Sequence, residues 1–562
     1  MALGALISGA IMLGAASCGS SGGTSTAGTP AGGGVVPHTN GGVVKVALNG
    51  SVDYIDPALD YYQSGWQIQY STDVKLTNYK DLPGNAGRVI YPEAASALPT
   101  VSSDGLTYTY TVPPGRFKFN TGEPVTAKTF QYAIERDLNP KQSSFFGAFF
   151  LGPYIKGATG WNGKGHIAGV QVSGDKLIIT LTKPDGALIP ELTTPFADAI
   201  PLSTPIDSKG VNSIAAAGPY YISSFTPNKA LVLKKNPNWT NAAWKRPAYA
   251  SEIDYVNLTI DQNAGTLEAR NGQLDYINDA IVPAEINQLN AQFGPKAPGG
   301  ASPRFFLTPA ATILYEAMNT ARPAFKNQLV RQAVSWALDR PALSRVAGFG
   351  VEQPTDKYLP PQIAGSQQEK SIYPITSPTA ADISKAKALI AQSGVKTPIK
   401  AVLYTCNAAP CPDRAAILQQ NLKQIGIDLT IKEFTRGVQF TKEGNKGEPF
   451  DIADEGWIAD FYDAYDFMNV LLNGEHIPAT GGNNFSYFNN PTFNKLSDQA
   501  NALTGTARDK AYGDLATQTA QTWAPWAGRA VASNYDFFSA RIGCQVDQGS
   551  YGFALNSFCL KK

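Results

Sequence analysis

The sequence predicts an α/β protein that folds as more than one lobe. Its 562 residues exceed what a single hydrophobic core usually organises, so we expect two to four lobes. Strand-like and helix-like segments both recur along the chain. Hydrophobic residues make up 43% of the chain and aromatic residues 10%, which is typical of a globular protein rather than a disordered one.

The predicted elements begin with a buried strand at residues 43–48, followed by a turn at Asp56-Pro57. Residues 107–112 alternate as a half-exposed strand, and a second alternating strand is expected at 116–120 after the Pro-Pro-Gly turn. Thr126 should cap a helix whose apolar face contains Phe130, Ala133 and Ile134. Later segments are a strand at 176–182, a hairpin-like pair at 218–222 and 230–235, and helices at 328–338 and 381–392, the last closed by Ser393-Gly394.

Charge argues against a polyanionic partner. The formal net charge is +1 and no long charged run occurs. We therefore predict no nucleic-acid partner and no broad electrostatic attachment to anionic membranes.

The N-terminus indicates export. Residues 1–17 contain a short apolar run of the size of a signal-peptide core, too short to span a bilayer. The run ends in small residues before Cys18 and resembles the lipobox of bacterial lipoproteins, although Ala15 replaces the usual Leu and no Lys or Arg precedes it. The missing basic region leaves open whether Met1 is the true start. Residues 18–42 then read as a lipidated Cys18 and a flexible Gly/Ser/Thr tether.

Cysteine spacing favours an oxidising compartment. Cys406 and Cys411 lie close together, as do Cys544 and Cys559. We expect two local disulfides, with reduced thiols as the alternative.

The candidate ligand site is the segment 450–461, where apolar and acidic residues alternate and Trp457 stands three residues before Asp460. An aromatic ring beside a carboxylate can hold a cation by cation–π contact and a charge-assisted hydrogen bond. The alternative is a strand end whose aspartates, Asp451 and Asp454 included, point to solvent.

The sequence offers no catalytic residue, no metal site and no cofactor motif. The three histidines, His38, His166 and His476, form no HExxH or Cys-His cluster, and no GK[ST] phosphate loop occurs. A GxSxG match at residues 19–23 follows no strand and precedes no helix. We therefore predict that the protein is not an enzyme.

A series of short landmarks then appears in a fixed order. They are IDPAL at 55–59, GEPVTAK at 122–128, AGPYY at 217–221, NPNW at 236–239, IDYV at 253–256, NGQLD at 271–275, RPAF at 322–325, VRQA at 330–333, ALDR at 337–340, WIAD at 457–460 and NNPTF at 489–493. In this order the chain resembles the extracytoplasmic solute-binding proteins of the oligopeptide, dipeptide and nickel class (family 5), which serve ABC importers. Thr129 and Ala464 depart from the residues frequent at their positions.

The resemblance implies a two-lobed, type II periplasmic-binding-protein-like α/β fold, with an extra α/β domain inserted in the first lobe and a hinge between the lobes. It implies that residues 43–79, 206–311 and 529–562 form lobe I, residues 80–205 the extra domain and residues 312–528 lobe II.

The resemblance also implies a function. In members that bind peptides, the aspartate of the Trp-x-Ala-Asp pattern receives the ligand's α-ammonium, which points to Asp460 with Trp457 lining the pocket. Partners would be a peptide, the importer permeases with their ATPases, and the membrane through a lipid at Cys18, on the outer face of the cytoplasmic membrane. We predict a monomer. A metal chelate, an oligosaccharide or a sensing role without transport are the alternatives.

Overall fold

A computed structural model of the chain describes residues 36–50, 52–145, 147–240, 246–278, 281–297, 303–348 and 350–562. The predicted signal peptide, Cys18 and the tether up to residue 35 lie outside the described residues. Within the described residues, every helix is too short or too polar to cross a membrane.

The largest element of the fold is a sheet of 11 strands. Ten of them follow one another across the sheet in the order β16 (Ile427–Phe434), β15 (Ile399–Cys406), β17 (Ile452–Ile458), β13 (Phe305–Met318), β18 (Trp526–Phe538), β12 (Tyr276–Asn278), β2 (Val43–Leu48), β11 (Glu252–Asn257), β10 (Ala230–Lys235) and β9 (Tyr220–Thr226). The short β14 (Glu352–Pro354) pairs with β18.

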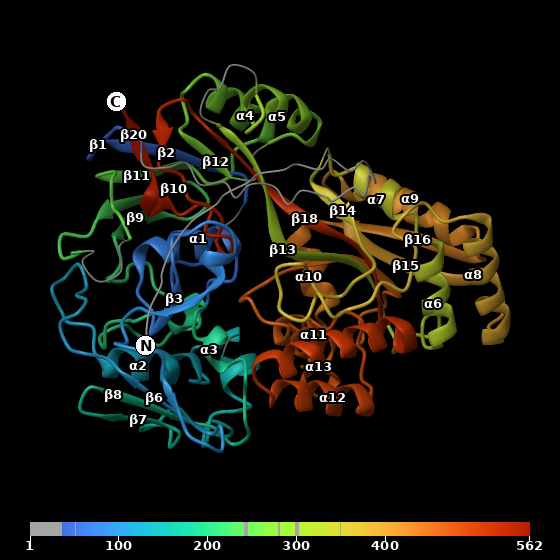
Figure 1. Cartoon of the computed structure of the whole chain (residues 1–562), viewed down its shortest axis with the longest axis horizontal. Helices are drawn as coiled ribbons and strands as arrows, with labels where there is room; N and C mark the ends of the chain where they lie inside the picture. The colour runs from blue at the N-terminus through green and yellow to red at the C-terminus, as the bar shows by residue number, and fades with distance from the viewer. Residues whose placement is uncertain are drawn as a thin grey trace, which may run out of the picture.

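Two long strands join the halves of this sheet. β13 and β18 pair with each other from Phe305 to Ala317, and both run through the centre of the molecule (Figure 1). β18 pairs with β12 at one end, and β13 pairs with β17 at the other. We call the half around β2 and β9–β12 the first lobe and the half around β14–β17 the second lobe. Because only a few strands connect the halves, this crossing is the natural hinge.

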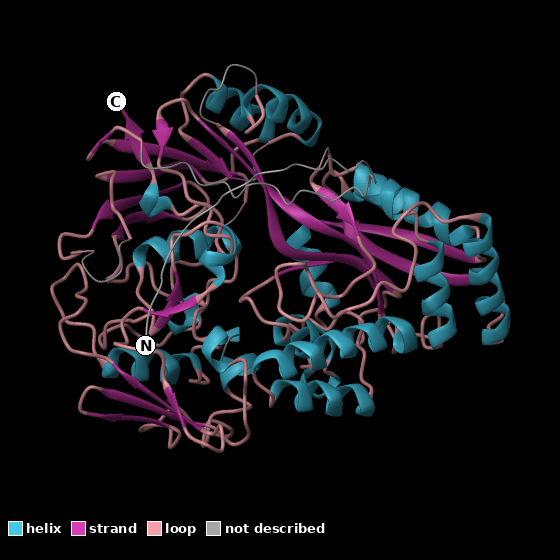
Figure 2. Cartoon of the chain, viewed as in Figure 1, coloured by secondary structure: helices cyan, strands magenta, loops and turns pink. Residues whose placement is uncertain are grey.

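Helices cover both lobes (Figure 2). Those of the first lobe are α1 (Gln63–Thr72), α4 (Gln262–Arg270) and α5 (Ile286–Phe293). Those of the second lobe are α6 (Gln328–Ala337), α7 (Arg340–Arg345), α8 (Ala380–Ser393), α9 (Cys411–Lys423), α10 (Arg436–Glu443), α11 (Tyr465–Leu472), α12 (Pro491–Asn501) and α13 (Gly505–Gln518).

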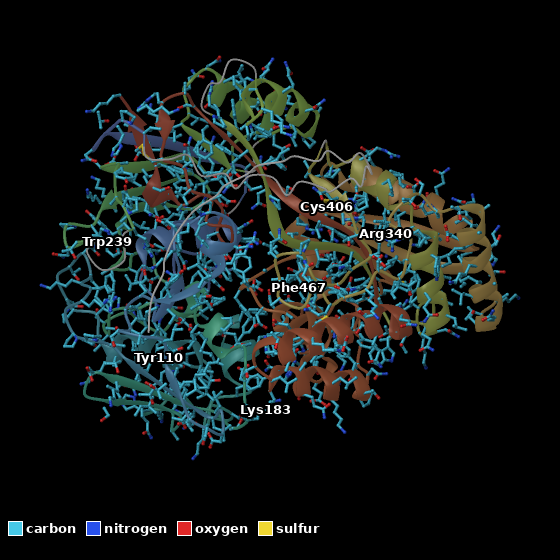
Figure 3. The ribbon with its side chains drawn as sticks, viewed as in Figure 1. Tyr110, Lys183, Trp239, Arg340, Cys406 and Phe467 are labelled. Carbon is cyan, nitrogen blue, oxygen red and sulfur yellow. A yellow bond between two sulfur atoms is a disulfide. The ribbon has the colours of Figure 1, made fainter. Side chains whose placement is uncertain are left out.

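A separate small sheet forms the extra domain beneath the first lobe (Figure 1). Its strands lie in the order β5 (Thr100–Val101), β6 (Thr107–Thr111), β8 (Lys176–Thr180) and β7 (Val170–Ser173). The helices α2 (Ala127–Asp137) and α3 (Leu188–Glu191) accompany it, and the short strands β3 (Thr77–Tyr79) and β4 (Ile90–Pro92) pair beside it. Tyr110 on β6 is fully buried in this domain (Figure 3).

Most of the predicted elements are present with small boundary shifts. The strand at 43–48, the pair β9 and β10, and the helices at 328–338 and 381–392 are confirmed. Thr126 is the N-cap of α2, and its backbone N–H donates to Oγ1 of Thr129 at 3.2 Å. Thr129 thereby performs the capping role of the acidic residue that it replaces. Gly394 ends α8 in the left-handed conformation with φ of 69°, as a C-terminal glycine does.

Two predictions about elements are wrong. Residues 116–120 form no strand, because their pairing is limited to an isolated bridge between Lys118 and Pro124. The alternation there reflects the burial of Phe117 and Phe119 on one side of a tight turn. The predicted tether also extends too far, since His38–Thr39 form β1, which pairs with β20 (Cys559–Lys561). β20 pairs in turn with β19 (Ile542–Gly543).

Both predicted disulfides are present. Cys406 bonds Cys411 between the end of β15 and the start of α9 (Figure 3), and Cys544 bonds Cys559 beside β19 and β20. The second disulfide fastens the C-terminal segment at the place where β1 enters the folded body.

Candidate ligand-binding site

Asp460 is the second residue after the end of β17. The last residue of that strand, Ile458, pairs with Thr312 of β13, and Ala459 N–H donates to the carbonyl of Ala311. Beyond this point the chain leaves the sheet and turns toward α11. Asp460 is 8% exposed and lies at the seam between the two lobes.

The carboxylate of Asp460 is held from the opposite lobe. Tyr61, from the segment after β2, donates its hydroxyl to Oδ2 of Asp460 at 2.9 Å. The Tyr61 ring packs on Phe145 with ring centroids 4.7 Å apart and against Trp66 at 5.8 Å. The backbone N–H of Asp460 donates to Oδ2 of Asp466 at 2.9 Å, which fixes the turn.

The segment that carries Tyr61 contacts both the extra domain and the start of α1. Asp56 receives two hydrogen bonds from the guanidinium of Arg136, at 2.7 and 2.6 Å, and so ties this segment to the extra domain. The carboxylate of Asp60 lies over the start of α1, where a Cβ on Gly65 would stand 2.2 Å from Oδ2 of Asp60. Glycine at position 65 is therefore required by this close approach.

The electrostatics of Asp460 favour a cationic ligand. Burial raises its pKa to about 7, and the hydrogen bond from Tyr61 only partly opposes this shift. None of the groups in the described structure that shift this pKa is a cation. Burial and the charge of Asp460 raise the pKa of Tyr61, so Tyr61 stays a donor. A buried carboxylate without a cationic partner is costly, and a ligand ammonium would relieve that cost.

Trp457 supports the turn that carries Asp460. Its indole Nε1–H donates to Oδ2 of Asp466 at 3.1 Å, the same oxygen that binds the backbone of Asp460. Burial and the negative charge of Asp460 raise the pKa of Asp466 well above its ordinary value. The expected contact of Trp457 with a ligand stays a prediction.

Asp451 and Asp454 do not point to solvent. Oδ1 of Asp451 accepts from Nε of Arg322 at 3.1 Å, and its Oδ2 accepts from the backbone of Val402 at 2.9 Å. Asp454 accepts from Arg529 at 2.7 Å and lies 3.4 Å from Arg414. Both aspartates are buried and structural, so the solvent-facing alternative for this segment is wrong.

Asp454 belongs to a buried charge network across the hinge strands. Arg529 on β18 pairs with Glu316 on β13 at 2.9 Å, and Arg414 pairs with Glu352 at 2.5 Å. Burial disfavours the charge of Asp454, but the two arginines outweigh burial and lower its pKa. Burial raises the pKa of Glu316 to about 8 despite Arg529, so Glu316 holds a proton at neutral pH.

A second set of contacts closes the seam at the extra domain. Oδ1 of Asp185 accepts from Asn501 at 2.9 Å, and the N–H of Gly186 donates to the carbonyl of Asn501 at 3.0 Å. At the rim, Lys183 pairs with Asp498 at 3.2 Å (Figure 3). Since these contacts join residues 183–186 to α12, the lobes are closed on each other in this structure.

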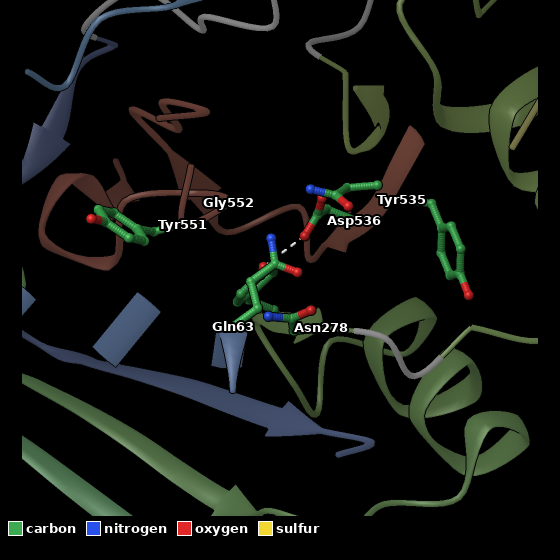
Figure 4. Close-up of a pocket in the computed structure, with 8 residues that line it drawn as sticks. Gln63, Asn278, Tyr535, Asp536, Tyr551 and Gly552 are labelled. Carbon is green, nitrogen blue, oxygen red and sulfur yellow. Dashed lines mark hydrogen bonds between the residues drawn. The ribbon is translucent and has the colours of Figure 1, made fainter. Parts of the chain in front are cut away.

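Two hollows in the described structure lie away from Asp460. One is a polar cavity of about 10 Å³ beside the hinge, lined by Gln63, Asn278, Asp536 and neighbouring residues, where the Tyr276 hydroxyl donates to Asp536 (Figure 4). It has room for about one water molecule. The other is an open groove of about 440 Å³ near the starts of α6 and α12. Neither carries the chemistry predicted at Asp460.

Metal ligands converge at one place among the described residues. His38, Cys544 and Cys559 present their ligand atoms within 4.8 Å of one another, but the two sulfurs are bonded to each other and offer no thiolate. His166 lies elsewhere and contacts Glu135. The one cluster of possible metal ligands among the described residues contains neither His166 nor His476.

Three residues with a candidate role in the structure were not predicted from the sequence. Tyr61 is 399 positions away from Asp460 in the sequence, although the adjacent tyrosines after the first strand were a usable signal. No sequence pattern distinguishes Asp466 from other polar residues in a helix. Glu191 gave no signal at all, because its burial depends on the packing of the extra domain against the second lobe.

The comparisons with known proteins agree with this architecture. The model of the bacterial extracellular solute-binding proteins, family 5, matches residues 89–478, so the chain belongs to that family. The chain is 27% identical over 430 residues to the oligopeptide-binding protein OppA of Bacillus subtilis, which covers 73% of this chain and 74% of OppA. It is 24% identical over 453 residues to the dipeptide-binding protein DppE of the same organism, with 77% of each chain covered. It is also 25% identical over 480 residues to heme-binding protein A of Haemophilus influenzae, with 81% of each covered.

Solved structures share the two-lobed fold. The clavulanic acid biosynthesis oligopeptide binding protein 2 superposes with a TM-score of 0.85 at 21% identity, covering 95% of this chain and 99% of that one. DppA from Helicobacter pylori, in complex with the peptide STSA, superposes with a TM-score of 0.75 at 19% identity, covering 93% and 99%.

Proposed function

We propose that this chain is the peptide-binding lipoprotein of an ABC importer, which captures oligo- or dipeptides between its lobes and delivers them to membrane permeases. One observation carries the proposal: Asp460 is a buried carboxylate at the seam of the lobes whose only side-chain hydrogen-bond donor among the described residues is the neutral Tyr61. A peptide α-ammonium supplies the missing positive charge. The peptide-binding relatives support the choice of ligand.

Closure of the lobes completes the mechanism. Peptide backbone would lie along the strand end at Ile458, adding hydrogen bonds that do not depend on side chains. Exclusion of water strengthens the pair between Asp460 and the ammonium, and the closed form is the shape that the permeases recognise. Trp457, through Asp466, keeps the Asp460 turn in place.

The proposal extends to the chain's organisation and location. Residues 1–17 are the signal peptide, and a lipid at Cys18 with the tether from residue 19 holds a monomeric body at the outer face of the cytoplasmic membrane. Residues 43–79, 206–311 and 529–562 form lobe I, residues 80–205 the extra domain and residues 312–528 lobe II.

Native mass spectrometry of protein purified without unfolding tests the ligand. We expect a co-purified peptide in the native protein and its loss in Asp460→Ala, with a fall in affinity of about 2–5 kcal/mol by calorimetry. Asn445→Ala, a change at a half-buried position of a loop in the second lobe, is the matched control and keeps the peptide. A co-purified metal chelate or oligosaccharide, or full peptide affinity in Asp460→Ala, would contradict the assignment.

A further inference from the structure

Glu191 is a buried acid that the proposed function leaves unexplained. It is the last residue of α3, and its side chain is 0% exposed. Neither carboxylate oxygen receives a hydrogen bond from any described residue. Nearly all buried polar side chains in proteins have a partner, so a carboxyl with two unpartnered oxygens needs a physical explanation.

The surroundings of Glu191 are acidic. α3 stands at the seam, facing the second lobe near α11 and α13 (Figure 1), and Gly186 just before it bonds directly to Asn501. Burial raises the pKa of Glu191 well above its ordinary value, and the charges of Asp185, Asp463 and Asp466 raise it further. Arg508 is the one cation among the leading influences on this pKa, and it opposes the shift.

Two nitrogens of Arg508 are already engaged, and its Nε is buried without an acceptor among the described residues. Its Nη1 pairs with Oδ2 of Asp463 at 2.6 Å, and its Nη2 donates to Asn501 at 3.0 Å. Oδ2 of Asp185 and Oδ1 of Asp466 are also buried without a donor among the described residues. Four carboxyl oxygens of Glu191, Asp185 and Asp466 therefore lack a hydrogen-bond donor among the described residues in one region of the seam.

This region continues into the predicted ammonium site. Asp466 binds the backbone of Asp460 at 2.9 Å, and Phe196, five residues after Glu191, packs on Tyr61 with ring centroids 6.0 Å apart. With Asp460 and Asp463 included, this part of the seam holds five carboxyl groups, and Arg508 pairs with one of them, Asp463. The other titratable groups that interact with these acids are the carboxyl of Asp509 and the hydroxyls of Tyr61, Tyr79, Tyr108, Tyr154, Tyr465, Tyr512 and Tyr551. No three of these carboxyls bring their oxygens within 4.8 Å of one another in the described structure.

Resting on the proposed function, we propose that the cleft selects peptides carrying a basic side chain next to the α-ammonium, with the ammonium on Asp460 and the basic group on Glu191 and Asp466. The guanidinium or ammonium of an Arg or Lys side chain brings the donors and the charge that these oxygens lack. In the unliganded protein, burial and the neighbouring acids disfavour the charged form of Glu191 and raise its pKa. A ligand cation favours the charged form, so on binding the O–H bond of the protonated carboxyl breaks, the proton passes to the buffer, and the carboxylate pairs with the ligand cation.

The test compares two peptide series by calorimetry at pH 7.5. One series has lysine and the other norleucine as the first residue, each followed by one to four alanines, so that the members of a pair differ only in the side-chain ammonium. We expect the lysine peptide to bind at least tenfold more tightly at the preferred length, and to release more protons than the norleucine peptide across buffers of different ionisation enthalpy.

Glu191→Gln should reduce the lysine preference below threefold and abolish the extra proton release while norleucine peptides still bind. The matched control is Glu135→Gln, a buried acid of the extra domain that is bonded to His166 and the backbone of Ile167, and it should keep both effects. Equal affinity of the two series, or a preference unchanged in Glu191→Gln, would overturn the inference and leave the proposed function standing. If no peptide of either series binds, the proposed function itself fails.

Discussion

Replacing Asp460 by asparagine should stabilise the unliganded protein while removing its ligand affinity. The pKa of Asp460 is about 7 in the folded protein, whereas it is about 3.9 in an unfolded chain. A carboxyl whose folded pKa is raised keeps its contribution to stability at low pH and loses it as pH rises from about 4 to about 7. At about 1.4 kcal/mol per pKa unit, ionised Asp460 lowers the free energy of unfolding by up to about 4 kcal/mol at pH 8.

Asparagine keeps the acceptor for Tyr61 and carries no charge. We therefore expect Asp460→Asn to raise the free energy of unfolding by about 2–4 kcal/mol at pH 8, and by only about 1 kcal/mol at pH 5. Urea denaturation of ligand-free protein at the two pH values measures both quantities. A loss of stability at pH 8, or an equal gain at both values, would refute the reasoning.

Asp454→Asn is the matched control for charge removal in the same segment. Arg529 and Arg414 stabilise the charged form of Asp454, so this variant should lose about 3–5 kcal/mol at pH 8. Opposite signs for two aspartates six residues apart would separate a ligand-binding carboxylate from a structural one.

Three further outcomes follow from the contacts. Arg529→Met leaves Asp454 and Glu316 without their shared guanidinium and should lower the free energy of unfolding by about 3–5 kcal/mol in urea denaturation, whereas an unchanged midpoint would contradict the network. Gly186→Ala places a Cβ 2.6 Å from the carbonyl of Asn501 and should prevent the lobes from closing fully. We expect a larger radius of gyration by small-angle scattering and a peptide affinity weaker by about 1–3 kcal/mol by calorimetry. A radius of gyration equal to that of the native protein would argue against a role of Gly186 in closure. Tyr61→Phe removes a donor to a charged oxygen and should weaken peptide binding at pH 7 by about 1.5 kcal/mol or more, so tighter binding would mean that Tyr61 competes with the ligand.

The strands and helices with strong local patterns could be predicted from the sequence. The apolar run Val43–Leu48 identifies a strand, of which only Val43 and Lys45 are exposed. The positions of Thr126 and Gly394 set helix ends through local hydrogen bonds and backbone conformation. Residues 116–120 show the limit of this reasoning. Alternation reports which side chains are buried, but a strand also needs a partner strand, and that partner is not visible locally.

The candidate site could be predicted only in part. The role of Asp460 could be predicted because the motif that indicates it, WIAD at 457–460, consists of four consecutive residues. Its donor Tyr61 comes from the other lobe, and the donors to Asp454 come from α9 and β18. Such contacts depend on how distant segments pack, so neither the burial of Asp454 nor the role of Tyr61 could be inferred from neighbouring residues.

The most direct test of the account concerns the ligand's ammonium. Calorimetry with the peptide that co-purifies, compared with the same peptide acetylated at its N-terminus, changes one charge and leaves the side chains intact. We predict that acetylation weakens binding to the native protein by at least about 2 kcal/mol, a factor of about thirty. Equal affinities for the two peptides would contradict the assignment of Asp460 as the ammonium site.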